Sequence, residues 1–254
     1  MIIDHDRKFV FIHVPKTAGT SIRSQLVTDS PNQVNLWHQG WVSSESRVVD
    51  LAHLPGYLAQ RVLQREGAES YYKFAFVRDP KLRFISGLRE VARRHAAEFR
   101  LGSLSGLVSF LEHLRPASVT FDWTLVHLCP QHVFLYADGS TLIDEIVTDL
   151  TQLSPRLSAL LDGRDIPTLR AAKPSVIDDW VLGLDQMIEE TVLRLYWKDY
   201  ELLFGGSTRP QVQHDSDRVQ ASLDPMLRTV TSPDHTWNEN MLRCWTQATE
   251  RLQL

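Results

Sequence analysis

Residues 8–26, KFVFIHVPKTAGTSIRSQL, constrain the fold of this chain more than any other stretch. A mostly apolar run over residues 9–14 leads into a turn that contains Pro15 and Gly19, and an apolar-periodic segment begins at Ile22. This pattern predicts a strand, a loop and a helix in that order. The first N–H groups of a helix have no intrahelical acceptors, so a loop that ends at a helix opening can bind a phosphate. The stretch therefore predicts an α/β fold with a phosphate site after this strand.

The side chains of this loop also suit an anionic ligand. Lys16 supplies a positive charge, and Gly19 lets the backbone approach a ligand closely. The alternative is an ordinary strand-to-helix turn with an N-cap hydroxyl, but the lysine and the apolar strand before it favour a binding site. The candidate cofactor-binding residues of the loop are Lys16, Thr17, Ala18, Gly19, Thr20 and Ser21.

The loop departs from the Walker A pattern GxxxxGK[ST] of nucleoside triphosphatases. With Gly19 and Ser21 aligned to that pattern, Thr20 stands where the lysine belongs and Val14 where the first glycine belongs. Lys16 precedes the glycine instead, so its ammonium would reach a 5'-phosphate from the other side of the loop.

His13 to Ser21, HVPKTAGTS, resembles the 5'-phosphosulfate loop of sulfotransferases, in particular the carbohydrate sulfotransferase branch with Golgi-type and bacterial members. Ala18 stands where that branch usually has glycine, and alanine is small enough to keep the loop plausible. The resemblance implies a P-loop-like parallel β-sheet flanked by helices, and 3'-phosphoadenosine 5'-phosphosulfate (PAPS) as the donor. It implies no metal ion.

A histidine follows the next β-branched run. Residues 47–51 (RVVDL) predict a strand, and His53 comes just past its end, before Pro55 and Gly56. Ligands bind at the carboxyl ends of strands in open α/β sheets, although a lone histidine there can also be a surface or capping residue. The segment resembles the GHxPxG motif of the same branch, with Ala52 for the first glycine and a shorter proline-to-glycine spacing. The resemblance implies that His53 is the catalytic base.

A second strand and helix carry an arginine at their junction. Residues 71–77 (YYKFAFV) predict a strand, and Arg78 follows it directly, with Ser86 eight residues further along the predicted helix. A guanidinium and a hydroxyl suit a second phosphate, although an Arg-Asp pair that caps a helix with proline at its first position is an alternative. Residues 78–86 resemble the RDPxxRFxS segment of the branch without departure, which implies that Arg78 and Ser86 bind the 3'-phosphate.

The remaining chain gives weaker functional signals. Arg93, Arg94 and His95 most simply lie on a solvated helix face, and could instead contact an anionic acceptor. Gln131 lies in a segment that resembles the family's PQ…FLY, near the acceptor side, and is otherwise a turn residue. The patterns predict a strand over residues 133–136 and helices over residues 58–65, 104–114, 154–161 and 187–200 and from Ile143.

Length and composition bound the organisation of the chain. The 254 residues, 43% hydrophobic, are enough for one substantial core with an appendage. We expect a sulfotransferase-like α/β domain over residues 1–205, and a linker with a C-terminal helical extension over residues 206–254, through which the chain could form a homo-oligomer.

Charge and hydropathy exclude several classes of partner. The formal net charge of −4 gives no reason to expect nucleic acid. No apolar run approaches the roughly 20 residues of a membrane span, and no basic and apolar leader precedes the first strand. Cys129 and Cys244 make neither a disulfide framework nor a zinc site. These observations predict a cytoplasmic protein, unlike the membrane-anchored Golgi members of the branch.

The residues and the resemblance together predict in-line transfer of a sulfuryl group from PAPS to an acceptor hydroxyl, on a carbohydrate or another small molecule. Lys16 would stabilise the leaving oxygen and His53 would accept the proton of the hydroxyl. Two alternatives stay open. One is a P-loop kinase or nucleoside triphosphatase, with Asp50 or Asp79 as the magnesium carboxylate, and the other is a non-catalytic relative that binds a nucleotide or glycan.

Overall fold

We describe a computed structural model of the chain. It describes residues 1–37, 39–42, 47–50, 52–116, 119, 123–148, 154–163 and 175–205, and only the backbone for 39–42, 47–50 and 123. The linker and helical extension predicted over residues 206–254, like residues 164–174, lie outside the described residues.

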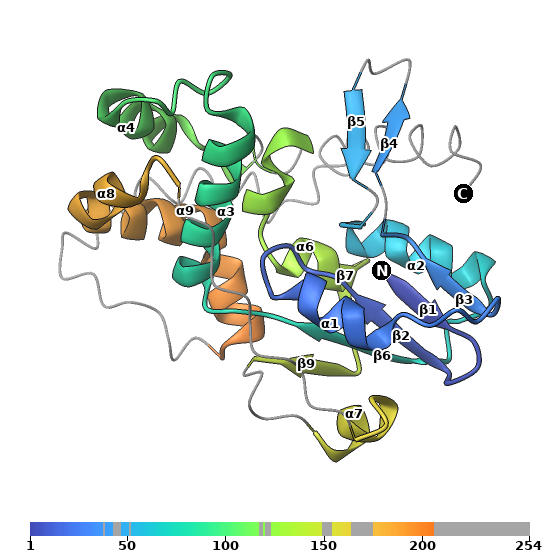
Figure 1. The fold of residues 1–254 in the computed structure, drawn as a ribbon. Helices are drawn as coiled ribbons and strands as arrows, with labels where there is room; N and C mark the ends of the chain where they lie inside the picture. Colours follow the sequence, from blue (N-terminus) through green and yellow to red (C-terminus); the bar gives the residue numbers. More distant parts are fainter. Residues whose placement is uncertain are drawn as a thin grey trace.

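Five strands form the main sheet in the order β3-β1-β2-β6-β9 (Figure 1). β2, β6 and β9 run parallel, whereas β1 is antiparallel to both β2 and β3. The prediction of a parallel sheet is thus wrong for its β1–β3 side. The reason is that residues 5–8 make too short a connection for a parallel crossover, so β1 and β2 form a hairpin. The strands are β1 (Ile2–Asp4), β2 (Phe9–Ile12), β3 (Gln33–Asn35), β6 (Tyr72–Phe76) and β9 (Glu145–Val147).

Two small two-stranded sheets lie apart from the main one. The strand predicted over residues 47–51 forms as β5 (Arg47–Asp50), but it pairs with β4 (Gln39–Val42) in a hairpin and does not join the main sheet. β7 (Tyr136–Ala137) and β8 (Ser140–Thr141) form the other pair.

The strand predicted over residues 133–136 is wrong, because the chain there forms the short helix α6 (His132–Leu135). A buried carboxylate explains the difference, since Asp199 accepts hydrogen bonds from the backbone N–H groups of Gln131 and His132 at the helix start. The helix predicted from Ile143 is also wrong, because residues 145–147 form β9, the edge strand of the main sheet. Short apolar runs of this kind fit a helix and a strand equally well.

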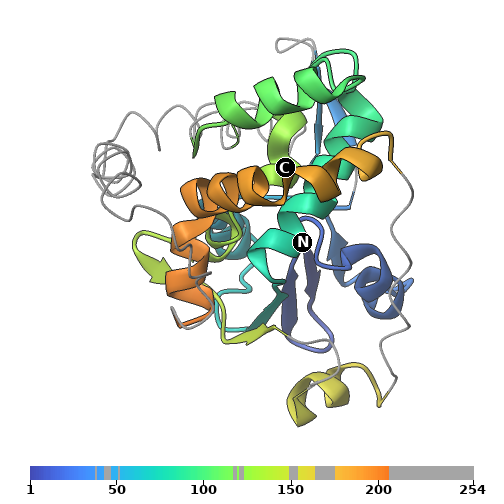
Figure 2. The ribbon, with the colours of Figure 1, turned by 90° about the vertical axis from the view of Figure 1, so that its left-hand side faces the viewer.

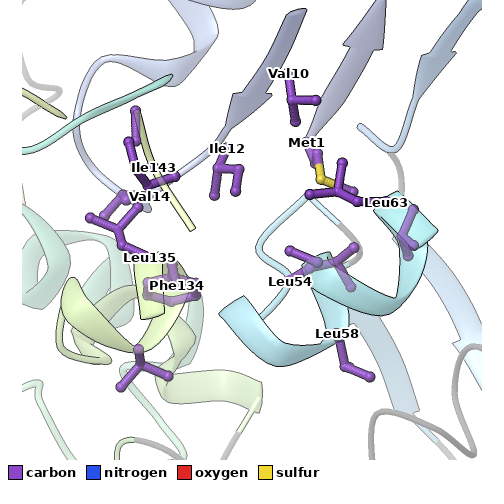
Figure 3. Packing of buried hydrophobic residues seen from close by; sticks show 14 of the residues in the cluster. Met1, Val10, Ile12, Val14, Leu54, Leu58, Leu63, Phe134, Leu135 and Ile143 are labelled. Carbon is purple, nitrogen blue, oxygen red and sulfur yellow. The ribbon is translucent and has the colours of Figure 1, made fainter. Parts of the chain in front are cut away.

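Both faces of the sheet are covered by helices. Along β2, Val10 and Ile12 face one apolar cluster, whereas Phe9 and Phe11 face another, as the two-residue period of a strand requires. The first cluster joins the sheet to α2 and α6 (Figure 3), and the second joins it to α1 and α7. These helices are α1 (Gly19–Leu26), α2 (Gly56–Arg65), α6 (His132–Leu135) and α7 (Pro155–Leu160).

The other long helices make a second unit beside the sheet (Figure 2), with an apolar core of its own. α3 starts where β6 ends, and it packs on the segment η1 and on α9. The helices predicted over residues 104–114 and 187–200 are confirmed as α4 and α9. The unit contains α3 (Pro80–His95), α4 (Leu104–His113), η1 (Trp123–Leu128), α8 (Asp178–Val181), η2 (Leu182–Leu184) and α9 (Asp185–Leu203).

Among the helices of the described residues, none combines the length and the apolar character needed to span a membrane.

Candidate anion-binding site at the ends of two parallel strands

The loop between β2 and α1 has a backbone shaped to bind an anion. Lys16 and Ala18 both adopt left-handed conformations, with φ of 66° in each case. Within the described residues, no group accepts a hydrogen bond from the backbone N–H of Thr17, Ala18, Gly19 or Thr20. Consecutive free N–H groups in such a backbone form an anion-binding concavity, and here they coincide with the start of an eight-residue helix.

Gly19 is required by a close approach. A Cβ atom on this residue would lie 1.8 Å from Nε2 of His13, far inside contact distance. His13 has little room to move, because its ring stacks on Trp37 with centroids 4.1 Å apart. From the sequence we expected a glycine here so that the backbone could approach a ligand. The structure shows that a larger residue would also collide with His13.

Two buried side chains fix the loop. The hydroxyl of Thr17 donates to the carbonyl of Val14 (2.9 Å), so it turns inward and leaves only its backbone for a ligand. The guanidinium of Arg83, from α3, donates to the carbonyl of Pro15 (3.0 Å) and to that of Cys129 (2.5 Å). Arg83 is fully buried, so α3 and the loop are held together by hydrogen bonds that water does not compete for.

The ammonium of Lys16 points to α3. It lies 3.4 Å from Oε2 of Glu90, whose carboxylate also accepts short hydrogen bonds from Arg93 and Arg94. Burial raises the pKa of Glu90, but the hydrogen bond from Arg93 and the charges of Lys16 and Arg94 outweigh it and lower the pKa to about 2. Burial lowers the pKa of Lys16, against the effect of Glu90. The loop thus has a cation and a nearby fixed anion.

Arg78 lies at the same edge of the sheet as the loop. β2 and β6 are parallel neighbours, with Ile12 opposite Ala75, so their carboxyl ends meet there. The buried side-chain amide of Gln131 fixes the Arg78 backbone, accepting from its N–H (3.0 Å) and donating to its carbonyl (2.8 Å). The Arg78 side chain itself is exposed.

Ser86 lies on the helix that Arg78 precedes. Asp79 caps this helix by accepting from the backbone N–H of Leu82 (2.9 Å), with Pro80 as the first helical residue. The capping role that was the alternative for this segment is therefore confirmed for Asp79. Ser86 is two turns further along α3 and half-buried.

His53 is brought to the loop by packing and not by a strand of the main sheet. Leu54, next to it, and Val14, in the loop, are buried in the same apolar cluster (Figure 3). Nδ1 of His53 lies 3.4 Å from the carbonyl oxygen of His13, and the two rings have centroids 4.3 Å apart. The structure thus brings His53 close to the loop, as expected. The expected reason, a position at the end of a strand of the main sheet, was wrong because β5 belongs to a separate hairpin.

A family model described as "Sulfotransferase family" matches residues 1–141, more than half of the 254 residues. The chain belongs to the sulfotransferase family. A heparan-sulfate 6-O-sulfotransferase 1-B of Danio rerio is 25% identical to this chain over 245 residues, in a match that covers 83% of the chain and 58% of the relative. The chain therefore spans little more than half the length of this relative. No solved structure gave a significant match.

The residues of the loop between β2 and α1 suit the phosphosulfate end of a PAPS-like donor. Its free backbone N–H groups and the Lys16 ammonium are the donor set that a phosphate takes at a helix start. Among the described residues there is no cluster of three His, Cys, Asp or Glu side chains with the geometry to hold a metal ion.

Three residues of the candidate site escaped the sequence analysis. Glu90 was given no role, and Arg83 was covered only by the motif over residues 78–86. His127 carried no signal at all. It lies on η1 with its ring 5.3 Å from that of His53, centroid to centroid. Only the three-dimensional contacts of α3 and η1 could have revealed these residues, since each meets a partner far away in the sequence.

Proposed function

We propose that this chain transfers a sulfuryl group from PAPS to an acceptor hydroxyl by in-line displacement. The observation that carries the proposal is the pairing of two anion-binding features at one edge of the sheet. The first is the loop from Lys16 to Ser21, and the second is Arg78 with Ser86 at the end of the neighbouring strand. PAPS has phosphate groups at both its 5' and 3' ends, so it needs two such sites.

The loop would hold the 5'-phosphosulfate. The N–H groups of residues 17–20 donate to its oxygens, and Lys16 stabilises the charge that develops on the leaving oxygen. In this scheme Arg78 and Ser86 bind the 3'-phosphate, and the side-chain amide of Gln131 positions Arg78. Membership of the sulfotransferase family supports this assignment.

His53 is proposed to accept the proton of the attacking hydroxyl. Imidazole suits a general base near neutral pH. The carboxylate of Glu90 is another basic group near Lys16, and its pKa of about 2 makes it a poor proton acceptor. The difference supports the assignment of His53.

We propose a hydroxyl of a carbohydrate or a related small molecule as the acceptor. The name of the Danio rerio relative describes sulfation of heparan sulfate at a 6-O position. Heparan sulfate is therefore the first acceptor to test. The cytoplasmic location and the homo-oligomer stay predictions.

Donor binding is the first test. Isothermal titration with adenosine 3',5'-bisphosphate, ATP and AMP, with and without magnesium, should show tight and metal-independent binding of the bisphosphate alone. Arg78→Ala should abolish that binding, whereas Arg65→Ala on α2, an exposed arginine paired with Glu66, should leave it unchanged. Magnesium-dependent ATP binding without a response to the bisphosphate would favour the kinase alternative.

Turnover tests the catalytic assignment. His53→Ala should bind the bisphosphate like the unmodified protein and lose about 10²–10⁴-fold in the rate of PAPS consumption with heparan sulfate. Full activity of this variant would rule out His53 as the base. Binding of the bisphosphate without turnover on any hydroxyl would favour the non-catalytic alternative.

A further inference from the structure

The proposed mechanism gives no role to His127, one of the buried titratable side chains at the site. His127 lies near the end of the segment η1, and 9% of it is exposed. Within the described part of the chain, neither ring nitrogen of His127 forms a hydrogen bond. A largely buried side chain whose polar atoms have no protein partner can form its hydrogen bond to a ligand.

The groups around His127 are those of the proposed reaction. Its ring meets the ring of His53 edge to face at 77°. Burial lowers the pKa of His127 well below its ordinary value, and the positive charges of His53, Lys16 and Arg94 add to this effect, whereas Glu90 opposes it. His127 therefore lies beside the proposed base, and the proposed leaving-group cation Lys16 is near enough for its charge to lower the pKa of His127. The lowered pKa keeps His127 neutral at pH 7.

Close packing fixes the position of His127. A Cβ atom on Gly87 would lie 2.5 Å from the His127 carbonyl oxygen, so η1 sits directly on α3. Two residues away on α3, the guanidinium of Arg89 is bound by Asp178 (2.6 Å), and Glu90 begins the ion cluster with Lys16. The backbone of His127 is thus packed closely on α3, and a fixed position is what a preorganised catalytic donor requires.

The geometry of sulfuryl transfer assigns a place to such a group. In an in-line displacement the acceptor oxygen and the leaving oxygen lie on opposite sides of sulfur, and the three other oxygens lie in the plane between them. His53 belongs on the acceptor side and Lys16 on the leaving side. His127 lies beside His53 and within reach of the charge of Lys16, so it is suited to bond to an oxygen in that plane.

We propose that His127 is a further catalytic residue, whose neutral imidazole donates an N–H hydrogen bond to a sulfuryl oxygen in flight. This inference rests on the proposed function. The bond from sulfur to the acceptor oxygen forms while the bond to the 5'-phosphate oxygen breaks, and the hydroxyl proton goes to His53. His127 keeps its own proton throughout. The bisphosphate product carries no sulfuryl group, so His127 does not contribute to its binding.

The test compares His127→Phe, which keeps a planar ring without nitrogen, with His127→Gln, which keeps an N–H donor. PAPS consumption is followed with heparan sulfate as the acceptor and with water as the acceptor in its absence. Loss of one preorganised donor costs about 10²–10³-fold in rate. We expect that loss for His127→Phe and recovery to within about tenfold for His127→Gln. His113→Phe, on the exposed end of α4, is the matched control and should keep full activity.

Bisphosphate binding separates this role from a structural one. Both His127 variants should bind adenosine 3',5'-bisphosphate within about twofold of the unmodified protein, because the bisphosphate has no sulfuryl oxygen for His127 to bond. A tenfold change would correspond to about 1.4 kcal/mol. Unchanged turnover in His127→Phe, or equal losses of binding and turnover, would overturn the proposal. If His127→Phe does not fold, His127→Leu takes its place in the same comparison.

The pH profile distinguishes His127 from a base. His127→Gln should keep the acid limb of the rate profile, because His53 still titrates; loss of that limb would make His127 the base and overturn the proposal. Failure of the unmodified protein to bind the bisphosphate or to consume PAPS would instead reject the proposed function itself. Failure of the His127 proposal is therefore seen in the His127 variants, whereas failure of the proposed function is seen in the unmodified protein.

Discussion

The ammonium of Lys16 lies 3.4 Å from the carboxylate of Glu90, so the proposed leaving-group cation has an acidic partner before any donor binds. The 5'-phosphosulfate and Glu90 would compete for the same ammonium. Arg93 and Arg94 also contact Glu90, which lets the carboxylate stay neutralised when Lys16 turns to a ligand.

Removal of this competition should strengthen donor binding. Glu90→Gln is expected to lower the Kd for adenosine 3',5'-bisphosphate about threefold to tenfold, which corresponds to roughly 1 kcal/mol for a partly buried charge pair. Titration calorimetry measures the change. Glu189→Gln on α9, which removes an acidic partner of Lys81 on α3, is the control. Weaker binding in Glu90→Gln would show that Glu90 orients Lys16 for the donor.

The left-handed backbone of Ala18 predicts opposite effects of a smaller and a larger side chain. At φ of 66°, alanine carries a strain of roughly 1–2 kcal/mol that glycine does not. Glycine also increases the conformational entropy of the unfolded chain, which offsets part of the stability gained by relief of the strain. Ala18→Gly should therefore bind the bisphosphate normally and unfold at the same or a slightly higher temperature.

Ala18→Val provides the contrast. A β-branched residue at this φ is strained, so the loop should change its conformation and lose bisphosphate binding by more than about tenfold. Thermal unfolding and calorimetry on both variants check the pair. Equal binding by Ala18→Gly and Ala18→Val would show that the loop conformation does not matter for the ligand.

The amide of Gln131 should matter to both stability and the 3'-phosphate. Gln131→Leu removes both hydrogen bonds to the Arg78 backbone and leaves these backbone groups without their partner, at a cost of about 1–3 kcal/mol in the free energy of unfolding. Arg78 then loses its position, and bisphosphate binding should weaken, whereas AMP, without a 3'-phosphate, should respond less. Urea unfolding and calorimetry test this; equal losses for both ligands would contradict it.

Two buried histidines make stability depend on pH. Burial lowers the pKa of His13 and of His127 below the ordinary value, and the positive charge of His53 adds to both shifts. In the unfolded chain these groups take up protons below about pH 6.5, whereas the folded chain holds them neutral. Their contribution to stability is therefore complete above that pH and is lost as the pH falls below it.

The slope of this loss can be measured. Each such histidine changes the free energy of unfolding by up to about 1.4 kcal/mol per pH unit below pH 6.5. Urea unfolding between pH 7 and pH 5 should show a slope that His127→Gln reduces by one such contribution. His113→Gln, an exposed histidine on α4, should leave the slope unchanged. The same slope in His127→Gln and the unmodified protein would contradict the buried neutral state.

The elements with strong local patterns were predicted from the sequence. The turn before Gly19 and the motif from Arg78 to Ser86 each combine a strand, a polar junction and a helix within a few residues, and both are confirmed as such. The strands β1 and β3 have three residues each, too few for any periodicity. The helix at residues 132–135 depends on Asp199, which lies 67 residues further along the chain.

The candidate site was predicted in its parts and not in its contacts. Lys16, His53 and Arg78 were recognised by motifs, but the pairing of Lys16 with Glu90 joins residues 74 positions apart. The proximity of His53 and His127 depends on how the helical unit lies against the sheet. Local sequence patterns carry no information on such contacts, because they arise from the packing of two separate apolar cores.

Arg83 connects the sheet and the helical unit, so the stability of one depends on the other. Its guanidinium bonds the loop at Pro15 and the end of η1 at Cys129, and it lies 5.5 Å from the ring of Tyr196 in α9. Helices that contribute no atom to a bound phosphate are thereby coupled to it through one side chain. A ligand that binds only the folded loop shifts the whole folding equilibrium by mass action. Saturation with the bisphosphate should therefore slow hydrogen exchange in α9 as well as in α1.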